Sequence, residues 1–549
     1  MDLLARFRKP HAATPAHRIP LALPALRKNH TAHVYVIPRV RDEQTGDILT
    51  LDRVPARYPR AALTGEPASG TSSALAFLGN GGQVLSLADF HPLAPPQQFE
   101  NLARILLDDV AASRVHAEYL TRLIAENPNA QVYVAAEDAA LLPGELARLT
   151  LLPFHERELA SAIAAWLPGA AANAFSAVAK GSPLTRRLVY NPLDLFLLLQ
   201  VYAPDTPLPT RRAELFDAYL TAHLKTESDP ELARRALEGI ALSTKRGQVA
   251  QDEHLARGYG LLRKADGGRI TFAHALLHDF LAAAALRRNP DLAPVLERLD
   301  DGNWQQVILF YVGLATPEGA TAIAEAFAGR EQWDRAALAL GQAAEIPDAL
   351  QKRIADKLIP RAWENEDPAA LAGLRAMRSG TANEFFAARL KERNPELRAR
   401  AARILGRLQS DRAIEALLPQ LRETNGDARD QVVAALGASK SDRVIEPLLV
   451  ALRGDNRVGA VDTRLRVAAA RALGQTGSER AVPALIVDLQ VGEPEVRTAA
   501  ARALVQIRSD LALKPLQAIA LSNAADEVRA TAAQVLQAMQ EYRSTETNT

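Results

Sequence analysis

Two glycines and the hydroxyl side chains that follow them make one stretch of the chain chemically distinctive. Gly65 is followed by four residues and then by Gly70, Thr71 and Ser72, ahead of an Ala/Leu/Phe run that predicts a helix. In such a spacing the glycines let backbone N–H groups converge on phosphate at a helix N-terminus, and a lysine reaches the β- and γ-phosphates. The spacing therefore predicts a phosphate-binding loop within residues 63–78.

Thr71 stands where a phosphate-binding loop has its lysine. The loop therefore keeps its spacing and lacks its main positive charge. A second interpretation is a Gly/Ser-rich turn in which Ser72 or Ser73 caps the following helix. The elements around the loop must decide between the two interpretations.

Short apolar runs alternate with helical segments around this loop. The predicted elements are strands at 33–37, 83–87, 105–109 and 132–134, a hairpin turn at 45–47 and a helix at 113–126. Strands that alternate with helices indicate a parallel sheet covered by helices. We therefore expect a small parallel α/β domain around the loop.

Composition limits the class of protein. A chain of 549 residues is too long for one core, so three or more domains are expected. A net charge of +1 gives no general attraction to nucleic acid. The absence of cysteine excludes disulfides, thiolate catalysis and cysteine-bound metals. No apolar run reaches the ~18–20 residues of a membrane span, and residues 1–20 lack the apolar core of a signal peptide. Aromatics are only 5% of the residues, whereas alanine, leucine and arginine, which favour helices, are abundant. We therefore expect a cytoplasmic, mainly helical protein.

The middle of the chain is predicted to be helical, with one exception. Residues 153–225 contain helical patterns separated by proline and glycine. Within 230–288, Asp266-Gly267-Gly268 separates two alternating runs, which predicts a hairpin. Helices around one hairpin suggest a winged helix-turn-helix.

Helical repeats occupy the C-terminal part of the chain. Five segments share a pattern whose arginines are 31, 37, 31 and 32 residues apart, namely Arg398, Arg429, Arg466, Arg497 and Arg529. A two-helix unit of this size cannot bury its own apolar face, so the units must stack into a solenoid. The alternation of arginines with acids is typical of a solvated, salt-bridged face. The units resemble short HEAT repeats of the phycobilin-lyase-like type, and 291–393 is expected to contain more divergent units.

Two segments outside the loop resemble the NACHT family of STAND-type P-loop NTPases. Residues 191–220, NPLDLFLLLQVYAPDTPLPTRRAELFDAYL, resemble the segment in which an NPL turn opens a helix and LP-x-x-R-x-E-L-[FY] follows. Residues 270–286, ITFAHALLHDFLAAAAL, resemble the winged-helix segment F-x-H-x-x-[FL]-x-[DE]-[FY]-x-A-A. The resemblance covers roughly residues 30–290. It implies that Pro192 packs near adenine and that His274 contacts the ADP phosphate.

Both residues also have structural interpretations. Pro192 suits the first position of a helix, and His274 suits a buried histidine at a strand end. A zinc site is a further alternative, because His274 and His278 lie four residues apart, as in HExxH. Ala275 stands where that motif has its glutamate. Without this general base, a metal site is not expected there.

Three departures from the family pattern remove charge from the predicted site. Thr71 replaces the loop lysine, Ala111 and Ala112 replace the acid pair of "LLLDGLDE", and Glu137 stands at the sensor arginine. Asp108 keeps the first, magnesium-associated acid of that strand. Phosphoryl transfer depends on positioning and on neutralising charge. We therefore predict no catalytic residue and no competent ATPase.

Nucleotide binding is expected to be weak or absent. The residues that the resemblance assigns to ATP or ADP are Gly65, Gly70, Thr71, Ser72, Ser73, Asp108, Pro192 and His274, with Mg²⁺ on Ser72 and Asp108. An empty pocket in a domain retained as a rigid scaffold is the alternative.

Three functions remain open at this point. The first is a non-catalytic NACHT-type regulator or scaffold whose solenoid binds a protein partner. The second is an active signalling ATPase, which needs a replacement cation such as Lys180, Arg186 or Arg187. The third is a HEAT-repeat lyase-like or chaperone-like protein, which leaves residues 30–290 without a role. A membrane or nucleic-acid partner is not expected, and self-association on activation is an option that the resemblance implies.

The expected fold is mainly α, and its predicted parts follow the chain. They are an irregular lead-in (1–30), a degenerate P-loop NTPase-like domain (31–153), a helical domain (154–228), a winged helix (229–290), divergent helical repeats (291–393), a HEAT solenoid (394–540) and a tail (541–549).

Overall fold

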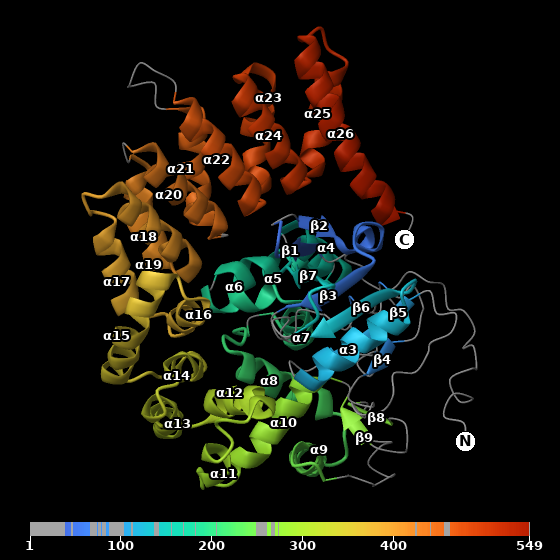
Figure 1. The fold of residues 1–549 in the computed structure, drawn as a ribbon, viewed down its shortest axis with the longest axis vertical. Helices are drawn as coiled ribbons and strands as arrows, with labels where there is room; N and C mark the ends of the chain where they lie inside the picture. The colour runs from blue at the N-terminus through green and yellow to red at the C-terminus, as the bar shows by residue number, and fades with distance from the viewer. Residues whose placement is uncertain are drawn as a thin grey trace.

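The computed structural model is mainly helical, with one seven-stranded and one two-stranded sheet among its described residues. It describes residues 39–547 except 46–47, 66–73, 75–77, 79–83, 87–103, 111–113, 137–141, 155, 168, 182, 205, 249–260, 265–269, 273, 423–424, 440 and 455–461. Figure 1 shows a sheet region, a helical region and an arc of C-terminal helices. Among the described residues, none of the helices has the combination of length and apolar character that a membrane span requires.

The larger sheet has the strand order β2-β1-β7-β3-β6-β5-β4. Its strands are β1 (Arg39–Asp42), β2 (Ile48–Thr50), β3 (Arg60–Thr64), β4 (Val84–Ser86), β5 (Arg104–Val110), β6 (Gln131–Ala136) and β7 (Ala147–Leu151). Strands β7, β3, β6, β5 and β4 run parallel. Strand β1 pairs antiparallel with both β2 and β7. The prediction of a parallel sheet was therefore wrong at one edge. There the β1–β2 hairpin adds two antiparallel strands beside β7, a strand that was not predicted.

The other predicted elements of this region agree with the structure. Strands β4, β5 and β6 coincide with the predicted runs, and α3 (Arg114–Glu126) coincides with the predicted helix. Thr45 lies in the connection of the β1–β2 hairpin, as the turn signal indicated. The strand predicted at 33–37 lies outside the described residues. A short 3-10 turn, η3 (Leu51–Arg53), and α1 (Val54–Arg57) connect β2 to β3.

Helices cover both faces of the sheet. On one face, Leu120 of α3 shares a core with Val132 of β6. On the opposite face, the helical residues Ala74 and Leu78, which follow the predicted loop, share a core with Tyr133. Val132 and Tyr133 are neighbours in β6, and successive side chains of a strand point to opposite faces. The sheet region is therefore a three-layer α/β structure.

Helices dominate the part of the chain that follows β7. They are α4 (Glu156–Trp166), α5 (Gly169–Gly181), α6 (Pro183–Val189), α7 (Pro192–Val201), α8 (Arg212–Leu224), α9 (Pro230–Lys245) and α10 (Ala275–Arg287). Between α9 and α10, β8 (Leu262–Lys264) and β9 (Ile270–Phe272) form the predicted antiparallel hairpin. Its turn, Asp266-Gly267-Gly268, lies outside the described residues.

Every described element after α10 is helical, as predicted. These helices are α11 (Ala293–Leu296), η7 (Gly302–Trp304), α12 (Gln305–Leu314), α13 (Pro317–Gly329), α14 (Trp333–Leu340), α15 (Asp348–Asn365), α16 (Pro368–Ala376), α17 (Gly380–Arg389), α18 (Pro395–Leu408), α19 (Asp411–Leu417), η8 (Leu418–Arg422), α20 (Gly426–Ala438), η9 (Asp442–Val444), α21 (Ile445–Arg453), α22 (Thr463–Thr476), η11 (Glu479–Ala481), α23 (Val482–Val491), α24 (Pro494–Ile507), η12 (Asp510–Ala512), α25 (Leu513–Ala520) and α26 (Asp526–Thr547).

The even-numbered helices stack one on the next from α12 to α26. Each of them except α26, the last, is followed by a second helix, and each such pair is one repeat of the solenoid. The pairs α12–α13, α14–α15 and α16–α17 therefore supply the register of the divergent units in 291–393, which the sequence pattern did not show.

The repeat arginines are less exposed than predicted. The side chains of Arg429, Arg466 and Arg497 are only 13–14% exposed. Arg466 binds Asp488 at 2.5 Å within its repeat, whereas Arg429 and Arg497 reach acids of the next repeat. These arginines therefore lie in the contacts of the stack, and the predicted solvated face was wrong for them.

Glycines permit the close approach of neighbouring repeats. A Cβ built on Gly406 would lie 2.7 Å from the Cβ of Ala435. On Gly437 it would lie 2.8 Å from the Cα of Ala472. A separation below 3 Å is a steric clash with atoms that belong to the next helix and cannot rotate away. The glycine at the end of each LG pattern is therefore a packing requirement of the solenoid.

Substitution of Gly437 by alanine should destabilise the protein by about 1–2 kcal/mol, because overpacking costs roughly 1–3 kcal/mol and exceeds the gain of about 1 kcal/mol in helix propensity. Gly239 of α9 is the matched control, since a Cβ there has no neighbour within 4 Å. Gly239→Ala should raise the urea midpoint and Gly437→Ala should lower it. Equal stabilisation by both substitutions would contradict this account of the stack.

Candidate functional site

The predicted loop leaves the sheet at the carboxyl end of β3. Gly65 is the first residue after this strand and is half-buried. β3 lies between β6 and β7, and the helices that follow β3 and β5 lie on opposite faces of the sheet. Parallel α/β sheets bind ligands at carboxyl ends where the connections diverge in this way. Gly70, Thr71, Ser72 and Ser73 lie outside the described residues.

Asp108 lies near the carboxyl end of β5, two strands from β3. Leu107 pairs with Val134 and Val110 pairs with Ala136. Between these pairs β5 therefore contains one more residue than β6, which is a β-bulge. Bulges of this kind change the direction of side chains and are frequent beside active sites. The sequence-predicted Ala111, Ala112 and Glu137 lie outside the described residues.

The NPL turn lies beside the chain that leaves β7. Phe154, three residues after this strand, donates its backbone N–H to the carbonyl of Tyr190 at 2.9 Å. Asn191 caps α7 by accepting the N–H of Leu193 at 3.2 Å. Pro192 is the first residue of α7, where its missing N–H costs nothing. The structure therefore brings Pro192 near the edge of the sheet that carries Gly65.

His274 occupies a different element, at the start of α10. Its Nδ1 accepts the N–H of Leu276 at 3.1 Å, so the imidazole caps the helix. α10 packs against α9 and α12, and it touches α8. His274 is half-buried. It is thus a capping residue rather than the buried histidine at a strand end that was the structural alternative.

The two histidines considered for zinc binding have different hydrogen-bond partners. Nε2 of His278 lies 2.8 Å from the hydroxyl of Thr244 and 3.0 Å from the carbonyl of Ala241. Its ring stacks on Phe272 with centroids 4.9 Å apart. Within the described part of the chain, no three metal-binding side chains gather at one point.

The proposed replacement cation Arg186 is held inside the helical region. Its Nε and Nη2 donate to the carbonyl of Lys180 at 3.0 and 2.9 Å, which joins the end of α5 to α6. The side chain of Arg187 is not among those described. Arg186 therefore serves the α5–α6 connection.

A buried ion pair that the sequence analysis missed joins α7 to α8. Asp194 is completely inaccessible to solvent, and Arg212 donates to its two carboxylate oxygens at 2.6 to 3.1 Å. Asp194 is the acid of NPLDLF, and Arg212 is the arginine of LP-x-x-R-x-E-L. A lone acid inside an apolar helix was the signal available in the sequence. The family-like arginine therefore has a structural role.

Arg211, the residue before Arg212, links α8 to the solenoid. Its Nη1 donates to the carbonyls of Gly313 and Gln342, at 3.1 and 3.4 Å. These carbonyls lie at the end of α12 and just after α14. A Cβ on Gly313 would lie 2.7 Å from the Cβ of Ala213, so the methyl group of Ala213 in α8 packs directly on the backbone of α12. We name this contact the α8–α12 junction.

Aromatic rings extend the α8–α12 junction to α10. Phe216, Phe280 and Phe310, one from each helix, have ring centroids 5.1 to 5.6 Å apart. The buried residues from Phe154 to Met539 form one continuous apolar core. The helical region and the solenoid are therefore one packed body.

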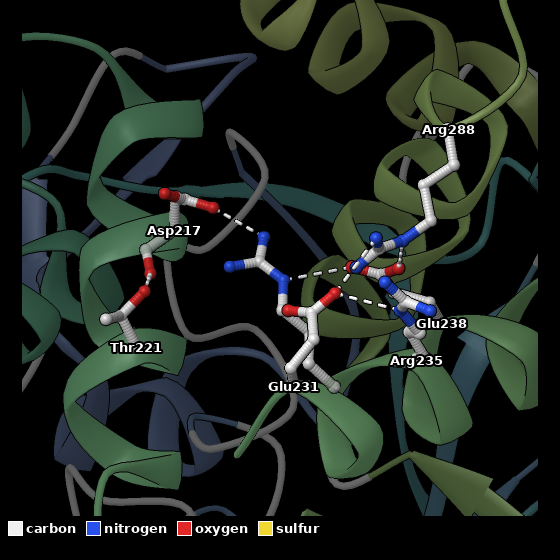
Figure 2. Close-up of polar contacts among 7 residues, drawn as sticks. Asp217, Thr221, Glu231, Arg235, Glu238 and Arg288 are labelled. Atoms are coloured by element: carbon white, nitrogen blue, oxygen red, sulfur yellow. Dashed lines mark hydrogen bonds and ion pairs between the residues drawn. The ribbon is translucent and has the colours of Figure 1, made fainter. Parts of the chain in front are cut away.

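A second ionic network ties α8, α9 and the end of α10 together, as Figure 2 shows. Arg234 lies between Asp217, at 2.5 Å, and the buried Glu238, at 2.9 Å. Arg288 also binds Glu238, and it binds Glu231 at 3.1 Å. Removing a buried carboxylate from water is costly unless cations compensate it. Glu238 therefore requires both arginines and holds the three helices in register.

Loss of the arginine that faces Asp194 should be strongly destabilising. Arg212→Met should lower the stability of the protein by about 3–5 kcal/mol, because it removes the ion-pair partner of a buried charge. The double variant Asp194→Leu/Arg212→Met should recover part of this loss. Arg235→Met is the control: both members of its pair with Glu231 are more than half exposed, so less than about 1 kcal/mol is expected. Chemical denaturation measures all three, and equal losses at Arg212 and Arg235 would refute the burial argument.

Acidification should destabilise the region around His278. Burial, and then the Lys245 ammonium, lower the pKa of His278 to about 4. The unfolded chain, with a pKa near ~6.5, binds more protons between these values, so stability falls as the pH drops from about 6.5 to 4. Asp279 acts in the opposite direction, because burial raises its pKa. His278→Gln should therefore reduce the loss of Tm between pH 7 and pH 5, relative to His223→Gln. An unchanged loss would show that His278 does not contribute.

Comparison with known proteins identifies the C-terminal repeats. Residues 383–461 and 456–537 match the family model of HEAT repeats. A comparison with curated proteins found no match.

Three solved structures align with between 39% and 89% of the chain. An engineered protein aligns at 20% identity over 60% of this chain and 98% of its own, with a TM-score of 0.23. Human deoxyhypusine hydroxylase in complex with glycerol aligns at 19% over 39% and 99%, with a TM-score of 0.14. A signal transduction ATPase with numerous domains (STAND) and a tetratricopeptide repeat sensor, from Pyrococcus horikoshii, aligns at 12% over 89% and 91%, with a TM-score of 0.28. These TM-scores are too low to establish a shared fold. The repeat match stands by itself, and residues 383–537 are HEAT repeats.

Proposed function

We propose that this chain is a non-catalytic regulator or scaffold of the NACHT type. Its HEAT solenoid binds a protein partner, and the sheet and helical regions hold the solenoid in a defined orientation. HEAT repeats typically mediate protein interactions. The α8–α12 junction carries the proposal, because it joins the solenoid to the helical region by the close packing of Ala213 on Gly313 and by the Arg211 hydrogen bonds.

The sheet region is proposed to be a degenerate P-loop domain. The position of Gly65 at the end of a central parallel strand, between helices on opposite faces, supports a phosphate-binding origin for the loop. Thr71 in place of lysine argues against strong phosphate binding. ATP or ADP with Mg²⁺ is therefore expected to bind weakly or not at all, through the loop residues, Asp108, Pro192 and His274.

An active ATPase of the same class remains the competing proposal. It requires a cation in place of the loop lysine, and Arg186 is committed to the carbonyl of Lys180. A lyase-like or chaperone-like HEAT protein is the third proposal. It gives no role to the sheet region or to the helical region, although the helical region shares one apolar core with the solenoid.

The test is nucleotide binding together with phosphate release. Purified protein, mixed with fluorescent ATP or ADP with and without Mg²⁺, should bind weakly or not at all and should release no phosphate above background. Thr71→Lys should tighten ATP binding by about 10- to 100-fold, the effect of a charged hydrogen bond worth roughly 1.5–3 kcal/mol. Thr121→Lys, on the exposed side of α3, is the charge-matched control.

Two results would overturn this proposal. Phosphate release that follows the protein and disappears in Asp108→Ala would make the chain a working ATPase. An equal effect of Thr71→Lys and Thr121→Lys would show that residues 63–78 are not a phosphate-binding loop.

A further inference from the structure

The second helices of four consecutive repeats expose apolar residues at one equivalent position. These residues are Pro419, Val450, Val487 and Ala518, and all four are exposed. Val450 and Val487 retain 54% and 53% of their accessible surface. We name these four residues the apolar row. Packed helices lie about 8–10 Å apart, so the three intervals of the row cross about 24–30 Å of the solenoid.

Ion pairs border the apolar row on one side and stop before the last repeat. The two pairs occupy equivalent positions and are Glu415–Arg443, at 2.9 Å, and Glu446–Arg480, at 4.0 Å. The next pair of equivalent positions, one in each of two successive repeats, holds Pro483 and Leu511 instead of an acid and an arginine. Leu511 is 60% exposed, and Leu521 at the end of α25 is 88% exposed. The surface therefore becomes more apolar towards α25, without a packing reason within the described chain.

Cations border the other side of the apolar row. Arg422 and Arg453 each follow a residue of the row by three positions, and both are exposed. Lys514, in the last of these repeats, is exposed on the side of the ion pairs, at the position equivalent to Glu415 and Glu446. The acids Glu415 and Glu446 are already matched by arginines of the next repeat. The charge that this face leaves for a partner is therefore positive.

We propose that the apolar row binds an extended acidic peptide segment of a partner protein. This proposal rests on the scaffold function above and assigns the partner's chemistry. An extended chain advances about 3.3 Å per residue, so an apolar side chain at every third position matches the spacing of the repeats. Asp or Glu side chains between them face Arg422 and Arg453.

Charge argues against two other occupants of this face. A second copy that paired through the same face would bring its own Arg422 and Arg453 into the same interface, because such contacts are isologous. Residues 1–38 of this chain contain six Lys and Arg and a single acid. Like charges would therefore oppose both arrangements.

Fluorescence anisotropy with the full chain tests the proposal. The probe is a fluorescein-labelled peptide of four Leu-Glu-Ser repeats, compared with Leu-Lys-Ser and Ser-Glu-Ser peptides. The acidic apolar peptide should bind most tightly. Val450→Glu/Val487→Glu and Arg422→Glu/Arg453→Glu should each weaken its binding at least tenfold, and the arginine variant should also reduce the salt dependence.

Matched variants separate this surface from others. Val178→Glu/Leu232→Glu makes the same change at exposed apolar residues of α5 and α9. Arg471→Glu/Arg502→Glu makes the same arginine-to-glutamate change at exposed arginines of α22 and α24. Both control variants should bind within twofold of the wild-type protein.

The opposite results overturn the proposal in distinguishable ways. If only Arg471→Glu/Arg502→Glu weakens binding, the solenoid binds through another face and the scaffold function stands. If only Val178→Glu/Leu232→Glu weakens it, binding lies outside the solenoid and both proposals fail. Equal binding of the lysine peptide, or no binding of the acidic one, refutes the acidic partner. A dimer in light scattering that Val450→Glu/Val487→Glu makes monomeric, without peptide binding, identifies a second copy as the occupant.

Discussion

Ala213 of α8 packs on the bare Cα of Gly313 in α12, and this contact, together with the packing of α10 on α12, joins the two halves of the chain. Arg211 reinforces it by donating to the carbonyls of Gly313 and Gln342. In a solenoid each repeat contacts only its neighbours. The orientation of every later repeat therefore follows from how the first one, α12–α13, sits on α8. The direction in which the solenoid presents its surfaces is thus determined far from those surfaces.

Buried charges make this arrangement specific. Asp194 and Glu238 are almost inaccessible, and each is matched by arginines from other elements or other turns. Taking a carboxylate out of water costs several kcal/mol, and this cost is offset only while the cations stay in place. A relative shift of α7, α8, α9 or α10 would break these pairs. The ionic networks therefore act with the apolar core to hold one geometry, even where their net contribution to stability is small.

The repeats separate packing from recognition. Positions such as Gly406 and Gly437 face the next helix at distances that admit no side chain, so packing dictates the residue. Positions of the apolar row face away from the stack, and the same packing leaves their identity open. The neighbouring positions hold paired acids and arginines in the earlier repeats, and the next equivalent pair of positions, before α25, holds apolar residues. A surface that departs from its own repeat pattern at exposed positions is where a partner can be specified.

The sequence alone determined the local elements and the repeat. Alternating apolar runs identified β4, β5, β6 and the β8–β9 hairpin, because the side-chain period of a strand is a local property. The period near 31 residues identified the solenoid for the same reason. The replacement of the loop lysine by Thr71 can also be read directly from the chain.

Only the tertiary structure decided the features that depend on distant contacts. β7 became a strand because β1 and β3 pair with it on either side, although its own residues carry a weak pattern. Arg211 and Arg212 are adjacent and equally basic, yet one reaches the end of α12 and the other reaches Asp194. The register of α12–α17 likewise came from stacking rather than from repeat similarity. Local periodicity selects helices and strands, whereas sheet order, buried charge pairs and helix contacts depend on which distant residues can be brought together without a clash or an unpaired charge.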